Sequence, residues 1–192
     1  MNLLLLGPQG AGKGTQAKRI SSNYGVPHVS TGDMFRAAIE AGTPLGKEVE
    51  PLLRDGILVP DELTVSMIRE RLSEDDAANG FVLDGFPRNL AQARALDDML
   101  REIGRGLDAI LFFDVPDSVG MERALKRAQI EHRDDDTREV IARRLATYHE
   151  ETEPVIEHYR TTGKLVPLHA GRTVEEVWHQ IEDALTQVEA LA

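Results

Sequence analysis

The stretch LLLLGPQGAGKGT, residues 3–15, joins a run of four leucines to a glycine-rich loop. A short, uniformly apolar run predicts a strand buried on both faces, as in a parallel sheet covered by helices. The glycines allow the loop backbone to turn tightly and to direct several N–H groups at one anion. The helical spacing of Thr15–Tyr24 places a helix N-terminus at the same point, and Lys13 adds a cation. The stretch therefore predicts a phosphate-binding loop.

The spacing of Gly7, Gly12 and Lys13 matches most of the Walker A motif, in its expected order of strand, loop and helix. Position 14 departs from the motif, because it holds Gly14 and the hydroxyl comes one residue later, at Thr15. A turn that merely joins a strand to a helix is the alternative, and the lysine in this context disfavours it. The expected phosphate-binding residues are Gly10, Ala11, Gly12, Lys13, Gly14 and Thr15.

Length and composition indicate an ordinary globular chain. Its 192 residues, 41% hydrophobic and 29% charged, suffice for one large domain or for a core domain with small insertions. The net charge of −11 argues against nucleic acid as a partner, although separate arginines can still form a basic cleft. The absence of cysteine excludes disulfides and thiolate metal sites and fits the cytoplasm. No run is long enough to span a membrane, and the N-terminus lacks the basic start of a signal peptide.

Short apolar runs alternate with helical segments along the chain. The expected strands are residues 3–6, a short piece within Gly25–Val29, Phe81–Asp84, Asp108–Val115 and Lys164–Leu168. This alternation predicts an α/β fold with a five-stranded parallel sheet, helices on both faces and right-handed crossovers. Ligands of such sheets lie at the carboxyl ends of the strands, where the glycine loop, Asp84 and Arg88 would meet.

Helical periodicity and capping residues predict the segments between the strands. The expected helices are Thr15–Tyr24, one capped by Thr31 or Asp33 and ended by Gly42, Leu45–Arg54, one capped by Asp61, Asn89–Ile103, Asp117–Gln129, one from Thr137 through Glu151 that kinks or restarts at Pro154, and Val174–Val188. The small helices between the second and third strands predict an insertion on one side of the sheet.

Five motifs, in this order, resemble those of the adenylate kinases: GPQGAGKGT, STGDMFR, DGFPRNLAQA, an arginine-containing break that ends in RDDD, and RRLATY. The resemblance covers essentially the whole chain, and DGFPR after a strand marks the nucleoside monophosphate kinases. It implies a P-loop NTPase-like single kinase domain, residues 1–192. The implied parts are a core of residues 1–29, 60–127 and 137–192, a helical insertion that binds the nucleoside monophosphate (NMP), residues 30–59, and a short lid, residues 128–136.

The resemblance places ATP on the glycine loop, with Arg127 on its phosphates and the backbone of Arg172 beside its adenine. Arg123 shares a helix face with Arg127, and a solvated face is the ordinary explanation for such charges. Asp84 ends a buried strand, where a carboxylate is costly unless it meets a cation or a metal-bound water. The family implies that Asp84 holds Mg²⁺ through water, and the alternative is that it only caps the turn. The short lid and the absence of cysteine predict that there is no structural zinc.

The same resemblance places AMP opposite the glycine loop. Arg88 and Gln92 lie one helical turn apart; arginine can bind a phosphate bidentately and glutamine can read a base edge, although alone the pair would indicate a solvated face. Thr31 is a helix cap, a base contact or both. The family assigns to AMP the residues Thr31, Arg36, Ile57, Leu58, Val59, Gly85, Phe86, Pro87, Arg88, Gln92, Arg133 and Arg144.

Lid closure would bring Arg133 and Arg144 to the transferring phosphoryl group. The family usually has glycine before the lid arginine; His132 stands there in this chain and predicts a stiffer hinge. Asp135 and Asp136 are expected to hold the lid arginines or to cap the next helix. The resemblance thus implies a catalytic set of Lys13, Asp84, Arg88, Arg127, Arg133 and Arg144.

These observations predict a cytoplasmic, monomeric adenylate kinase that catalyses ATP + AMP ⇌ 2 ADP with Mg²⁺. Its partners would be the small-molecule nucleotides ATP, AMP and ADP. A uridylate/cytidylate kinase is one alternative, which Thr31 and Gln92 disfavour because such relatives typically have a small residue and an asparagine there. A P-loop nucleotide-binding module that does not turn over a monophosphate is the other, and the Asn-Lys-x-Asp motif of a GTPase is absent.

Overall fold

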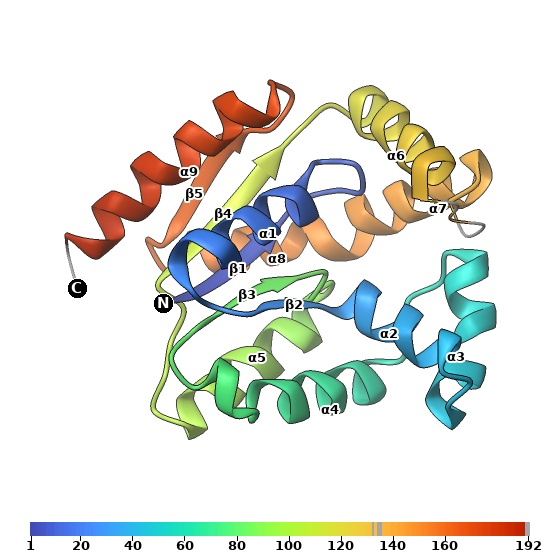
Figure 1. The fold of residues 1–192 in the computed structure, drawn as a ribbon, viewed down its shortest axis with the longest axis horizontal. Helices are drawn as coiled ribbons and strands as arrows, with labels where there is room; N and C mark the ends of the chain where they lie inside the picture. Colours follow the sequence, from blue (N-terminus) through green and yellow to red (C-terminus); the bar gives the residue numbers. More distant parts are fainter. Residues whose placement is uncertain (132, 134–135, 191–192) are drawn as a thin grey trace.

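The computed structural model describes residues 1–131, 133 and 136–190 and has a parallel sheet between two layers of helices (Figure 1). The strands are β1 (Asn2–Leu6), β2 (His28–Ser30), β3 (Phe81–Asp84), β4 (Ala109–Asp114) and β5 (Leu165–His169). They form a five-stranded sheet in the order β2-β3-β1-β4-β5, and every pairing is parallel. This arrangement confirms the predicted α/β class and its five-stranded parallel sheet.

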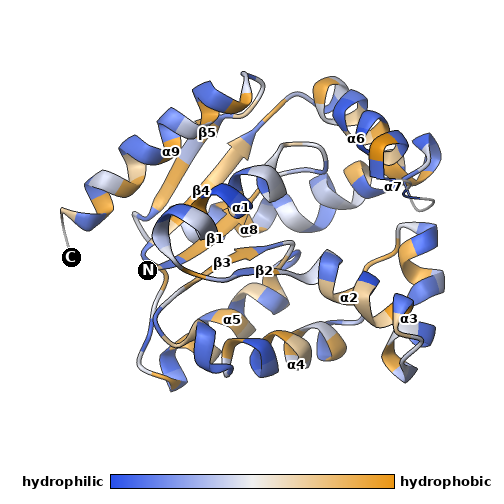
Figure 2. Ribbon diagram, in the orientation of Figure 1, coloured by the Kyte–Doolittle hydropathy of each residue, from blue (hydrophilic) through white to orange (hydrophobic). Residues whose placement is uncertain are grey.

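The four leucines of β1 divide between two apolar cores, one on each face of the sheet. Leu3 and Leu5 belong to the core beneath helices α1 (Lys13–Tyr24) and α9 (Val174–Glu189). Leu4 and Leu6 belong to the core on the opposite face. Figure 2 shows the strands as the apolar centre of the molecule, with hydrophilic residues concentrated on the outer helices. Burial on both faces explains why the strand reads as a continuous apolar run.

The remaining helices cover the second face or extend beyond the sheet (Figure 1). They are α2 (Thr31–Glu40), α3 (Pro44–Asp55), α4 (Asp61–Leu72), the short 3₁₀ helix η1 (Asp75–Ala77), α5 (Leu90–Glu102), α6 (Asp117–Glu131), α7 (Arg138–Thr147), the π-helix η2 (Tyr148–Thr152) and α8 (Glu153–Arg160). The π-helix was not predicted. The expected long helix ends at Thr147 instead, because Pro154 cannot donate a backbone hydrogen bond and the turn before it widens.

Two helix starts differ from the predicted caps. Ser30, and neither Thr31 nor Asp33, caps α2, since its hydroxyl oxygen accepts a hydrogen bond from the backbone N–H of Asp33 at 3.3 Å. Asp61 is the first residue of α4 and Pro60 stands at the cap position, without a side-chain cap. The hydroxyl of Thr31 and the carboxylate of Asp61 are therefore available for contacts with other segments.

Helices α2 and α3 form the insertion between β2 and α4, with a small apolar cluster of their own around Phe35, Val49 and Val59. They pack tightly, because a Cβ placed on Gly46 of α3 would lie 2.1 Å from the carbonyl oxygen of Ala38 in α2. In Figure 1 this pair lies at the lower right of the molecule, below α6 and α7. Within the described part of the chain, no helix has the length and apolar character needed to cross a membrane.

Candidate active site

A cavity of about 730 Å³ opens at the carboxyl ends of the strands. Its walls come from the glycine loop, the α2–α3 insertion, the loop between β3 and α5, and helices α6 and α7. Every residue predicted for ATP, AMP or Mg²⁺ lines it. These are Gly10, Ala11, Gly12, Lys13, Gly14, Thr15, Thr31, Arg36, Ile57, Leu58, Val59, Asp84, Gly85, Phe86, Pro87, Arg88, Gln92, Arg127, Arg133, Arg144 and Arg172.

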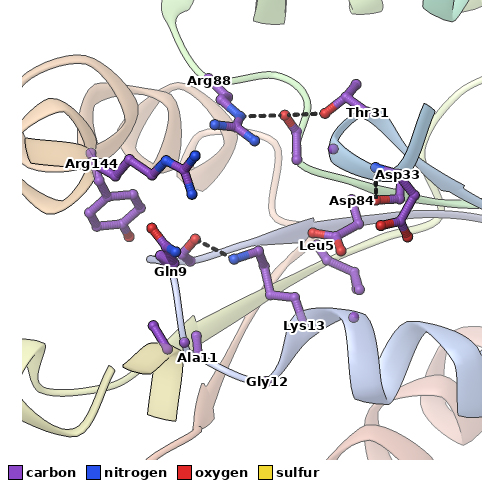
Figure 3. A pocket seen from close by; sticks show the side chains of 18 of the residues that line it. Leu5, Gln9, Ala11, Gly12, Lys13, Thr31, Asp33, Asp84, Arg88 and Arg144 are labelled. Atoms are coloured by element: carbon purple, nitrogen blue, oxygen red, sulfur yellow. Dashed lines mark hydrogen bonds between the residues drawn. The ribbon is translucent and has the colours of Figure 1, made fainter. Parts of the chain in front are cut away.

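The glycine loop wraps around the ammonium group of Lys13 (Figure 3). Its Nζ donates hydrogen bonds to the carbonyl oxygens of Gly7 at 2.7 Å and Pro8 at 2.8 Å. Gly12 stands at the cap position of α1 with a φ of 90°, a conformation that favours glycine. A Cβ on Gly10 would lie 2.0 Å from the carbonyl oxygen of Gly120, so the loop also packs closely against α6. The loop is thus built for backbone N–H groups and one lysine.

Lys13 and Asp84 perturb one another's ionisation. Burial lowers the pKa of Lys13 to about 8. The negative charge of Asp84 opposes this shift, and the positive charges of Arg88 and Arg127 add to it. Burial also opposes ionisation of Asp84, but His28, Lys13 and Arg88 outweigh it and hold the pKa of this carboxyl below its usual range. Asp84 is therefore ionised at neutral pH at the edge of the phosphate loop.

His28 is a neighbour of Asp84 that sequence reasoning did not identify. Its Nε2 lies 3.6 Å from Asp84 Oδ2, and both side chains are largely buried. The two come together because β2 and β3 are paired, with His28 aligned to Val82. The six histidines show no ligand spacing along the chain, so the sequence carries no signal for this contact.

A second group of cations lies across the cavity from Lys13. Arg88 donates through Nε to the carbonyl oxygen of Gly85 at 2.7 Å, and the Thr31 hydroxyl donates to the same oxygen at 2.9 Å (Figure 3). Burial and the nearby Arg144 lower the pKa of Arg88, with Asp84 opposing and Arg36 adding to the effect. Several guanidinium groups held close together form a strong binding site for an anion.

The start of α5 holds Gln92 in a closed network. Its Nε2 donates to Asp61 Oδ1 at 2.7 Å, and its Oε1 accepts from the backbone N–H of Arg88 at 2.8 Å. Asn89 caps α5 and also donates to Asp61. Sequence reasoning missed Asp61, because a carboxylate at a helix start is ordinarily read as a cap.

Asp136 joins segments that are far apart in the sequence. Its buried carboxylate accepts from Arg127 Nη2 at 2.6 Å, Arg144 Nη1 at 2.6 Å and Gln9 Nε2 at 2.7 Å. Thr137 caps α7, so Asp136 does not. Of the two roles predicted for Asp136, it therefore has that of holding arginines and not that of a helix cap. The predictions for Asp135 and for the hinge at position 132 lie outside the described residues.

The α7 arginines also reach the insertion. Arg144 Nη2 donates to the carbonyl oxygen of Leu53 at 2.8 Å, and Arg143 donates to that of Asp55. These carbonyls belong to the last turn of α3, where the helix hydrogen bonds end. The Leu53 carbonyl also accepts from the backbone N–H of Gly56 at 3.1 Å. The insertion and α7 are therefore in contact on this side of the cavity.

The other arginines that line the cavity have local carboxylate or carbonyl partners. Arg133 pairs with Glu131 at 2.6 Å and Arg36 with Asp33 at 2.7 Å. The expectation of a solvated face for Arg123 is wrong, because its guanidinium donates to the carbonyls of Ala170, Gly171 and Arg172. Arg123 thus organises the loop after β5, and the side chain of Arg172 is exposed.

The carboxylate available for a metal at the glycine loop is Asp84. Among the described residues, no group of three or more histidine, cysteine or acidic side chains is placed to hold a metal ion. A Cβ on Gly14 would lie 3.7 Å from Asp84 Oδ2, so this oxygen lies against the start of α1. A hard oxygen ligand beside a phosphate loop suits Mg²⁺, which keeps most of its ligands as water and substrate phosphate.

Comparison with known proteins agrees with this arrangement. A family model described as adenylate kinase matches residues 5–164. The chain belongs to the adenylate kinase family. An adenylate kinase of Thermobifida fusca is 48% identical, over 96% of this chain and 98% of that protein. Adenylate kinases of Streptomyces avermitilis and Archaeoglobus fulgidus are 42% and 40% identical, each over 99% of this chain and at least 99% of the relative.

Membership confirms the resemblance read from the motifs. It makes the chain a nucleoside monophosphate kinase, a phosphotransferase with a P-loop NTPase-like fold. The alternatives of a uridylate/cytidylate kinase or of a nucleotide-binding module without turnover are not favoured by these relatives.

Proposed function

We propose that this chain transfers the γ-phosphoryl group of ATP to the phosphate of AMP, reversibly, so that two molecules of ADP form. The observation that carries the proposal is the position of two cation groups on one cavity. Lys13 and the glycine loop lie on one side, and Arg88 with Arg36 and Arg144 on the other. A site for a single nucleotide would not require the second group, whereas a donor and an acceptor phosphate require both.

The residues take two sets of roles in this proposal. ATP would be held through its phosphates by Gly10, Ala11, Gly12, Lys13, Gly14, Thr15 and Arg127, and at its adenine by the backbone of Arg172. AMP would be held by Thr31, Arg36, Ile57, Leu58, Val59, Gly85, Phe86, Pro87, Arg88, Gln92, Arg133 and Arg144. The catalytic set would be Lys13, Asp84, Arg88, Arg127, Arg133 and Arg144. Residues 30–59 and 128–136 would close over the substrates from the core, and exclude water.

Such a transfer makes modest chemical demands on the protein. The phosphate of AMP is already an anion at neutral pH, so no general base is needed. Catalysis then consists of alignment and of neutralising charge on the phosphoryl oxygens, which Lys13 and the arginines do. Bound through water to Asp84, Mg²⁺ would neutralise charge on the ATP phosphates. We also propose that the chain is a cytoplasmic monomer whose partners are ATP, AMP and ADP.

Side-by-side assays of phosphate acceptors test this function. Purified protein, Mg²⁺ and ATP are incubated with AMP, UMP, CMP or GMP, and ADP formation is followed. We expect rapid ADP formation with AMP and much slower formation with the other three. ATP binding without AMP-dependent ADP formation would contradict the proposal, and a preference for UMP or CMP would assign a different acceptor.

A further inference from the structure

The carboxylate of Asp61 binds two side-chain amides at the start of α5. It accepts from Gln92 Nε2 at 2.7 Å through Oδ1, and from Asn89 Nδ2 at 3.0 Å and 3.3 Å through Oδ1 and Oδ2. Asp61 itself is not among the residues that line the cavity. Gln92 does line the cavity, and it is 2% exposed. Asp61 therefore acts on the cavity through the side chain of Gln92.

This network permits one orientation of the Gln92 amide. A carboxylate can only accept hydrogen bonds, so it requires the NH₂ of the amide to face Asp61. The backbone N–H of Arg88 can only donate, so it requires the amide oxygen to face position 88, and that distance is 2.8 Å. A half-turn of the amide would place oxygen against carboxylate and NH₂ against N–H. The half-turn would thus lose both hydrogen bonds of the amide, and each loss is costly in a buried group.

We infer that Asp61 is a positioning residue that determines base specificity by holding the Gln92 amide in this orientation. The inference rests on the proposed function, in which Gln92 reads the base of AMP. After its two internal bonds the amide keeps one N–H and one oxygen lone pair. Adenine offers a 6-amino donor beside a ring-nitrogen acceptor, which this fixed pair can match. A 6-oxo purine reverses the donor and the acceptor, and an amide unable to turn cannot follow.

Thr31 is oriented by the same principle on the same cavity. Its hydroxyl donates to the carbonyl oxygen of Gly85 at 2.9 Å, and the side chain is buried. A hydroxyl has one proton, so only its lone pairs are left for a ligand. Because the Thr31 hydroxyl can then only accept from a ligand, it favours a base with an amino group and repels a base with an oxo group. Protein partners thus set the orientation of two buried polar side chains on this cavity.

Comparison of AMP with inosine monophosphate (IMP) tests the inference. IMP differs from AMP in having a 6-oxo group and a protonated ring nitrogen in place of the 6-amino group and the acceptor nitrogen. For each variant kcat/KM is measured with both acceptors at saturating ATP, and the Kd of both is measured by isothermal titration calorimetry. The variants are Asp61→Ala, Gln92→Ala, the double variant, and Glu62→Ala. The last removes an exposed carboxylate from the same helical turn and is the matched control.

We expect Asp61→Ala to lower the preference for AMP over IMP about tenfold, within the range of one bidentate base contact. The preference should fall in both kcat/KM and Kd, and the KM for ATP should stay unchanged. Glu62→Ala should keep the wild-type preference. In the Gln92→Ala background, Asp61→Ala should change the preference no further, since the two side chains act as one unit. If Asp61 had a merely structural role, Asp61→Ala would lower kcat/KM by the same factor for AMP and for IMP.

Two results would overturn the inference, and they are distinguishable. A preference that falls in Gln92→Ala but is unchanged in Asp61→Ala would reject the role of Asp61 alone. An unchanged preference in Gln92→Ala would reject the assignment of Gln92 to the base, and the inference with it. If Asp61→Ala does not fold, Asp61→Ser serves instead, because a hydroxyl accepts or donates and leaves the amide free to turn.

Discussion

Arg127 and Asp136 form an ion pair in which Nη2 and Oδ2 are 2.6 Å apart. The carboxylate is wholly buried, and its other oxygen accepts from Arg144 and Gln9. One acidic side chain therefore ties the last part of α6 to α7 and to the glycine loop. This carboxylate thus orients two of the cations that are proposed to meet the phosphates.

Replacement of this carboxylate should destabilise the fold. In Asp136→Ala, Arg127 and Arg144 lose a buried partner, which typically costs on the order of 3 kcal/mol. For a chain of this length that corresponds to a Tm about 5–10 °C lower. Thermal unfolding followed by circular dichroism measures the change. Glu139→Ala, which removes an exposed carboxylate from the first turn of α7, is the control, and equal Tm values for the two variants would contradict the prediction.

Lys13→Met should abolish activity and stabilise the fold at neutral pH. Activity should fall by several orders of magnitude, because the phosphate loop loses its cation. The ordinary pKa of lysine is 10.5 and burial lowers that of Lys13 to about 8. Between about pH 8 and pH 10.5 the unfolded chain therefore binds more protons at Lys13 than the folded chain. The contribution of Lys13 to the stability of the fold is thus unfavourable below about pH 8 and rises with pH above it.

Thermal unfolding from pH 6 to 10 separates this effect from a general change in packing. We expect the Tm of Lys13→Met to exceed that of the wild type by a few degrees at pH 7, and the difference to shrink above pH 8. A variant that is less stable than the wild type at pH 7 would show that the hydrogen bonds of Lys13 to Gly7 and Pro8 outweigh its burial.

Arg88→Ala should separate binding of the acceptor from binding of the donor. The guanidinium is oriented by the Gly85 carbonyl and lies opposite the glycine loop, so its loss removes the charge that would face the AMP phosphate. We expect kcat/KM for AMP to fall by several orders of magnitude, with the Kd for ATP and the Tm nearly unchanged. Arg94→Ala, an exposed change in the helix α5 that follows Arg88, is the control. Near-normal turnover in Arg88→Ala would contradict the proposed acceptor site.

His149 should make stability depend on pH. Its Nε2 lies 2.8 Å from Asp117 Oδ2 and its Nδ1 lies 2.7 Å from Glu153 Oε1. These two hydrogen-bonded carboxylates raise the pKa of His149 above its ordinary value of 6.5. Its stabilising effect is then fully present below that value and is lost as the pH rises through the higher pKa of the folded chain.

The comparison of His149→Gln with the wild type at pH 6 and pH 9 measures this effect. The variant should have the lower Tm at pH 6, and the difference should be smaller at pH 9. A pH-independent difference for His149→Gln would contradict the prediction.

Much of the fold could be predicted because its signals are local. The four leucines and the glycines after them predict a buried strand and a phosphate loop from neighbouring residues alone. The predicted long helix through Glu151 was wrong in its last turn, where the π-helix from Tyr148 depends on how Pro154 is accommodated. The caps at Thr31 and Asp61 were wrong because several residues at each helix start can cap. Packing decides which of them does.

The sequence by itself determined the order of the elements, the family and the set of residues around the cavity, since motif spacing places them at strand and helix ends. Only the tertiary structure decided how those side chains are paired. Asp136 is distant from Gln9 in the sequence, and so is Asp61 from Gln92, yet each pair is within hydrogen-bonding distance. A hydrogen bond depends on where atoms lie in space, and residues brought together by folding leave no periodic pattern along the chain.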